Sequence, residues 1–138
     1  MDPAPELAND PVLASLEALA ETGKDITSDV YERFFTLRPD AEQSMEHTDT
    51  YMRGRMMEEV LQLLMTTPDQ VSEKYLQFET ENHTQSYGVD LALYQPLLEA
   101  VRDTVQSGLS PDWTDKCDRA WSERITALVS AITRAASA

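Results

Sequence analysis

The sequence predicts an all-α fold of about six helices and one short corner helix. Apolar residues recur at intervals of three and four along most of the chain, which is the spacing of one face of a helix. Capping residues followed by proline mark several helix starts, and no useful length of chain alternates apolar and polar residues as a strand would. The 138 residues predict one domain, with residues 1–8 and 135–138 expected to be disordered.

The first two predicted helices have clear boundaries. One begins after a capping residue, Asn9 or Asp10, and ends at Gly23. The other begins near Asp25 and must end before Pro39, because the residue that precedes a proline avoids helical backbone angles. Their apolar faces consist of Val12, Leu13, Leu16 and Leu19 in the first helix, and of Ile26, Val30, Phe34 and Leu37 in the second.

A short corner helix over residues 39–45 and a polar link lead to a third long helix, from about residue 49 to residue 66. Residues 67–70 form a predicted capping box for the next helix, which frays near residues 86–88. The apolar stripe of that helix is expected to be Val71, Tyr75 and Phe78. His83 lies one step off this stripe, so we expect it at the edge of the apolar face.

Two further helices complete the expected fold. Asp90 can cap a helix that is closed by Gly108, and Pro96 lies near its start as a potential kink. Residues 110–112 open the last helix. Its apolar seam is formed by Cys117, Trp121, Ile125, Leu128 and Ile132.

The composition excludes several classes of function. The 11 basic and 25 acidic residues give a net charge of −14, which would repel both nucleic-acid phosphates and anionic lipid surfaces. A single cysteine, Cys117, excludes an internal disulfide and Cys-rich zinc sites, and we expect it to be a buried, inert thiol. The first residues show no secretory signal and no apolar run approaches a membrane span, so we expect a cytoplasmic protein with neither nucleic acid nor membrane as a partner.

Any chemistry that needs imidazole must use one of two histidines, His47 and His83. The chain has no Gly-x-Ser-x-Gly turn and only four glycines, which argues against a hydrolase elbow or a phosphate cradle. His47, between acidic neighbours, is interpreted as a solvated loop residue. The pair Glu58 and Glu59 is interpreted as a solvated helix face.

The most specific pattern surrounds His83. Residues 82–89 read Asn-His-Thr-Gln-Ser-Tyr-Gly-Val, so the histidine ends a helix, a tight corner follows, and Tyr94 lies on the next helix. Three further pieces occur in order along the chain: residues 30–41, Trp113, and the pair Ala120 and Trp121. Together they resemble the globin family over about residues 10–132, most closely the bacterial single-domain haemoglobins and the haem domain of flavohaemoglobins.

This resemblance implies a globin-like fold around one b-type haem. His83 would be the axial iron ligand, and Tyr31 would project into the opposite, ligand-binding side as a hydrogen-bond donor. Val89 would pack on the proximal face of the haem, with Tyr87 in the same corner and Tyr94 in the proximal pocket. Tyr31 could equally be an ordinary packed aromatic residue.

The third helix would form the distal wall, with Met52 and Met56 facing the haem. Arg53 or Arg55 could instead reach the pocket or a propionate, and a register shifted by one residue would turn a glutamate inwards. Counting six residues from Pro39 leads to Met45, where the family presents a phenylalanine that stacks on the haem.

Glu79 lies one helical turn before His83 and raises a further hypothesis. Its carboxylate could accept the ring proton from the nitrogen that does not bind iron, which would increase the basicity of the ligand. The more frequent situation for a glutamate is exposure to water, and that interpretation is preferred.

The function implied by the resemblance is reversible binding of O₂, NO or CO, since one axial histidine leaves an open position on the iron. NO dioxygenation or gas sensing would be a further use, and turnover would require a separate reductase. A homodimer that packs its last two helices is expected by analogy alone. The alternative, from another class, is a haem-free globin-fold module for regulation or protein interaction.

Overall fold

The computed structural model describes residues 10–66, 70 and 72–137, and this part of the chain is almost entirely helical. The sequence prediction of an all-α fold is therefore confirmed for the described residues. The elements are α2 (Pro11–Glu21), α3 (Thr27–Leu37), α4 (Pro39–Ser44), α5 (Thr50–Met65), α6 (Glu73–Asn82), the π-helical turn η2 (His83–Tyr87), α7 (Leu91–Leu109) and α8 (Asp115–Ser137).

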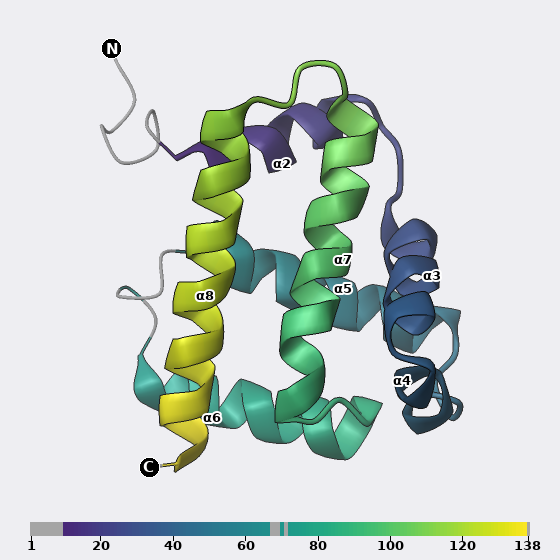
Figure 1. The fold of residues 1–138 in the computed structure, drawn as a ribbon. Helices are drawn as coiled ribbons and strands as arrows, with labels where there is room; N and C mark the ends of the chain where they lie inside the picture. Colours follow the sequence, from purple (N-terminus) through teal and green to yellow (C-terminus); the bar gives the residue numbers. More distant parts are fainter. Residues whose placement is uncertain (1–9, 67–69, 71, 138) are drawn as a thin grey trace.

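Figure 1 shows the two longest helices, α7 and α8, running side by side in opposite directions. Helix α5 crosses behind them, and α6 runs across the lower end of the same pair. Helix α3 packs on α7, α6 packs on α8, and η2 contacts α5. The end of α6 and the start of η2 therefore lie opposite α5, and the candidate site is formed between these elements.

Side-chain caps start four of the helices, three of them at or near the position that the sequence predicts and one, at Ser72, after the predicted capping box. The carboxylate of Asp10 accepts hydrogen bonds from the first backbone amides of α2, and Asp49, Ser72 and Asp90 cap α5, α6 and α7 in the same way. A side-chain acceptor at this position satisfies amides that have no partner inside the helix. These caps fix the point at which each helix enters the bundle.

Helix α7 continues through Pro96. A proline lacks the amide that would bond to the carbonyl four residues earlier, which here belongs to Ala92. The guanidinium of Arg38 donates a hydrogen bond to that carbonyl at 3.4 Å, so α3 and α4 meet α7 at the position left open by the proline.

Two expectations from the sequence differ from the structure. Residues 135–138 were expected to be disordered, but α8 continues to Ser137, and Ala135 is buried with its carbonyl accepting a hydrogen bond from Gln77. The expected apolar stripe of α6 is also wrong, because Tyr75 and Phe78 are exposed. The capping box at 67–70, apart from Gln70, and the stripe residue Val71 lie outside the described residues, as do residues 1–8.

The face of α6 that packs into the bundle carries Leu76, Glu79 and Thr80, and His83 continues it into η2. Two of these four residues are ionisable, which hides the face from a search for apolar spacing. The structure therefore places His83 on the buried face and not at its edge.

A search of the helices in the described part of the chain finds none with the length and hydropathy of a membrane span.

Candidate functional site

His83 is positioned by the end of α6 and by a tight corner. The chain leaves η2 through Gly88, whose φ of 78° is a left-handed conformation that favours glycine. A Cβ atom at Gly88 would overlap with the carbonyl oxygen of Ser44, so the corner also packs directly against the end of α4. After the corner, the amide of Val89 donates to the carbonyl of His83 at 3.0 Å and holds the turn closed.

The imidazole of His83 is completely buried, and Tyr94 of α7 fixes one of its nitrogens. Nδ1 lies 2.6 Å from the hydroxyl oxygen of Tyr94, which is itself buried. Burial, together with the charges of Glu79 and Glu59, raises the pKa of Tyr94 well above its usual value, so the phenol stays protonated. A neutral hydroxyl can donate to Nδ1 or accept its proton, and it therefore suits either tautomer of the ring.

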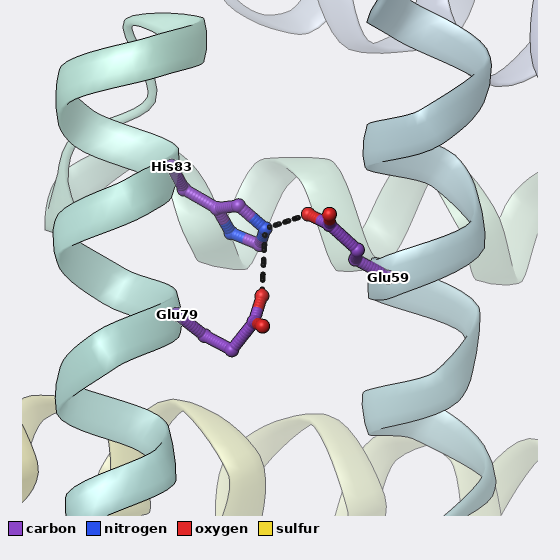
Figure 2. A group of neighbouring side chains, drawn as sticks. All are labelled: Glu59, Glu79 and His83. Carbon is purple, nitrogen blue, oxygen red and sulfur yellow. Dashed lines mark hydrogen bonds and ion pairs between the residues drawn. The ribbon is translucent and has the colours of Figure 1, made fainter.

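The other nitrogen of His83 faces two carboxylates. Nε2 lies 3.0 Å from Oε2 of Glu59, which reaches across from α5, and 3.4 Å from Oε2 of Glu79, one turn earlier on α6 (Figure 2). Oε2 of Glu79 is buried and makes no hydrogen bond with any described residue. One ligand atom from each of these three residues lies within 4.8 Å of the other two.

Both glutamates correct the interpretation drawn from the sequence. Glu79 was preferred as a water-exposed residue, yet it is buried, and it approaches Nε2 and not the nitrogen bound by Tyr94. Glu59 was placed on a solvated face, but its side chain is only 24 % exposed and points at His83, while Glu58 is exposed as expected. A register in which α5 turns a glutamate inwards was one of the alternatives left open.

Tyr31 lies in the core of the bundle. Its hydroxyl donates a hydrogen bond of 3.0 Å to the backbone carbonyl of Arg53 on α5, and burial raises the pKa of this phenol strongly. The guanidinium of Arg53 stacks over the rings of Tyr31 and Phe35, at 5.6 and 5.1 Å from their centroids. In this arrangement the hydroxyl proton of Tyr31 is used in the hydrogen bond to α5. Its donation to a gas ligand stays a prediction.

The remaining predicted site residues are mostly buried. Met45, Met56 and Val89 are completely buried, and Tyr87 is buried with its ring centroid 5.7 Å from that of His83. Burial and the charge of Glu59 raise the pKa of Tyr87. Met52, which was expected on the distal wall, is only half-buried at the margin of the core.

The alternatives for arginine and for the second histidine are also located. Arg53 is half-buried and donates through Nε to the hydroxyl of Thr48 at 2.9 Å, whereas Arg55 is exposed and lies beside Tyr51. His47 is exposed as predicted, and its Nε2 lies 2.8 Å from the carbonyl oxygen of Ser86. His47 therefore helps to hold the corner after α4 against η2.

The fold and this site define a class of protein: a helical bundle in which one buried histidine, ending a helix, faces a second helix across the core. The family model described as Globin matches residues 28–132, which is most of the chain and runs from the start of α3 into the C-terminal part of α8. The chain therefore belongs to the globin family. No curated protein matches the sequence.

Globins typically hold haem through a proximal histidine, and the residues around His83 fit that group in their chemistry. The imidazole is buried, its Nδ1 has a hydrogen-bond partner, and the ring of Tyr87 lies beside it. Two carboxylates conflict with this fit, because an oxygen of Glu59 at 3.0 Å and one of Glu79 at 3.4 Å from Nε2 occupy the approach that an iron atom needs. The side chain of Glu59 is partly exposed, so it has a route to solvent.

Proposed function

We propose that this globin holds one b-type haem at Nε2 of His83 and binds diatomic gases there. The observation that carries the proposal is the state of the two ring nitrogens, since Nδ1 is engaged by Tyr94 and Nε2 points towards α5. A metal-bound histidine needs this arrangement: one nitrogen as ligand, the other fixed by a hydrogen bond that sets tautomer and orientation. Bound to Nε2, a ferrous haem would supply reversible binding of O₂, NO and CO.

Each neighbouring residue has a defined task in this proposal. Tyr94 keeps the ring proton on Nδ1, because its oxygen accepts a hydrogen bond when Nε2 serves as the ligand. Met45, Met56 and Val89 are completely buried and would contribute to the apolar interior that keeps water away from the haem. Methionine is a flexible apolar side chain, and Met45 therefore fills the place of the family's phenylalanine without a flat stacking surface.

Glu59 controls access to Nε2. Its carboxylate must move away from the imidazole before the nitrogen can act as a ligand. The cost of breaking this charge-assisted hydrogen bond, about 1.5–3 kcal/mol, lowers the affinity of the wild-type chain for haem. The variant Glu59→Gln is consequently expected to take up hemin more readily. The same change at the exposed Glu58 is the matched control and should leave uptake unaltered.

The test is an absorption titration of the purified full chain with hemin. The proposal predicts a strong Soret band at one hemin per chain, which shifts when CO is added to the reduced protein. His83→Ala should abolish or grossly change the band, and His47→Ala should keep it. A Soret band that survives in His83→Ala and disappears in His47→Ala would show that His47, and not His83, binds the iron, which would overturn the proposal.

One observation favours the alternative of a haem-free globin module. The carboxylate of Glu59 already satisfies Nε2 within a packed interior, as a permanently haem-free protein would require. A chain that stays colourless with added hemin, yet remains helical by circular dichroism, would support this alternative.

For the haem-bound form, we propose NO detoxification with an external reductase as a further use.

A further inference from the structure

We propose that, in the haem-free chain, Glu59, Glu79 and His83 form a binding site for one divalent transition-metal ion. The ligands would be Nε2 of His83 and one carboxylate oxygen each from Glu59 and Glu79. This inference goes beyond the proposed gas binding, because it concerns a different occupant of the same nitrogen.

The geometry of the three ligand atoms suits such an ion. Nε2 lies 3.0 and 3.4 Å from the two carboxylate oxygens, and all three atoms lie within 4.8 Å of one another. Two ligands that each bind a tetrahedral zinc ion at about 2.0–2.1 Å are separated by roughly 3.3 Å. The site therefore needs small side-chain adjustments, and no movement of a helix, to close around an ion.

The buried oxygen of Glu79 is the second, independent indication. It makes no hydrogen bond with any described residue, although it is nine-tenths buried and directed at the imidazole. An unsatisfied buried carboxylate oxygen is costly, and a cation is the partner that removes this cost most completely. Glu79 and His83 are four residues apart on one helix face, a spacing that serves pairs of metal ligands on helices.

Charge balance leads to the same occupant. Two carboxylates in a mostly buried cluster carry a charge of −2, which a protonated imidazole would only reduce to −1. A divalent ion together with a neutral imidazole brings the sum to zero. The imidazole is a ligand of borderline hardness that suits Zn²⁺, Fe²⁺ or Co²⁺, and these ions also accept carboxylate oxygens, whereas Ca²⁺ and Mg²⁺ prefer sites made of oxygen ligands alone.

Metal and haem would exclude one another, because both need the lone pair of Nε2 of His83. The site would therefore act as a holding state of the haem-free globin, in which a metal ion satisfies the buried carboxylates. Hemin would have to displace this ion.

The test is calorimetric titration of the full chain, purified without added haem and stripped with a chelator, with ZnCl₂. We expect one Zn²⁺ per chain, and an affinity at least about tenfold lower in Glu79→Gln and in Glu59→Gln. Glu58→Gln, with the same loss of charge on the exposed face of α5, is the control and should bind as the wild type does. Equal affinities in Glu79→Gln and Glu58→Gln would overturn the proposal.

A measurement on the wild-type chain keeps the test decisive even if a variant fails to fold. The chain has two histidines, so Zn²⁺ should shift the side-chain nitrogen resonances of His83 in an NMR spectrum and leave those of His47 in place. His47→Ala provides the assignment. Shifts at His47 alone, or no shift at either histidine, would contradict the site. None of these readouts depends on haem, so the proposed gas binding can fail or succeed separately.

Discussion

The hydrogen bond between Tyr94 and His83 gives the most informative single substitution. Tyr94→Phe removes the hydroxyl 2.6 Å from Nδ1 and keeps the buried ring, so that no large cavity forms. A buried polar group that loses its partner costs about 1–3 kcal/mol. We therefore expect the free energy of unfolding of the haem-free chain, measured with urea, to fall by about this amount.

Tyr31→Phe is the matched control for that experiment. It also deletes a buried phenol that makes one hydrogen bond, in this case to the carbonyl of Arg53, so a similar loss of stability is expected. Of the two variants, only Tyr94→Phe should alter the iron–histidine stretching frequency of the ferrous haem protein, because Tyr94 bonds to the imidazole and the hydroxyl of Tyr31 bonds to Arg53. Unchanged stability in Tyr94→Phe, or the same stretching frequency in both variants, would refute the assignment of Tyr94 as the positioning residue of His83.

Three further predictions concern packing and reactivity. In a urea titration, Gly88→Ala should lower the free energy of unfolding by about 2 kcal/mol or more, because the backbone there is left-handed and the new Cβ would clash with the end of α4. The control Gly54→Ala, whose Cβ meets no neighbour, should leave this free energy unchanged or raise it. Arg124→Met removes the ion pair at 2.7 Å to the mostly buried carboxylate of Asp10, and the free energy of unfolding should fall by about 3 kcal/mol. Equal midpoints of urea unfolding for the variant and the wild type would show that the pair contributes nothing to stability. Burial raises the pKa of the Cys117 thiol, so less thiolate exists at any given pH. Alkylation by iodoacetamide should therefore reach half its maximal rate at a higher pH than for free cysteine. A half-maximal rate at a lower pH than for free cysteine would contradict this.

The sequence was sufficient to predict the helices, because capping residues and prolines act locally. Asp10, Asp49 and Asp90 each cap the helix that was expected to follow them. The corner around Gly88 was predicted for the same reason, since its backbone angle and its close packing both require glycine. The apolar register of α6 could not be predicted, because its buried face carries Glu79 and His83 in place of two hydrophobic residues.

The candidate site shows where local reasoning ends. His83 was identified from the residues that follow it, and Tyr94, its partner on α7, was placed beside it by the resemblance to globins. Glu59 comes from α5, 24 residues earlier, and its approach to His83 depends on how two helices rotate about their axes. A shift of one residue on a helix turns its face by about 100°, so the packed structure was needed to show that Glu59 faces inwards while Met56 is buried as expected.

The central claim is that Nε2 of His83 is the atom that holds the haem iron. Resonance Raman spectroscopy of the ferrous, gas-free protein tests it most directly through the iron–histidine stretching band. We predict that the band is present in the wild-type chain, absent in His83→Gly, and replaced by an iron–imidazole band when free imidazole is added to that variant. An iron–histidine band that persists in His83→Gly without imidazole would contradict the claim.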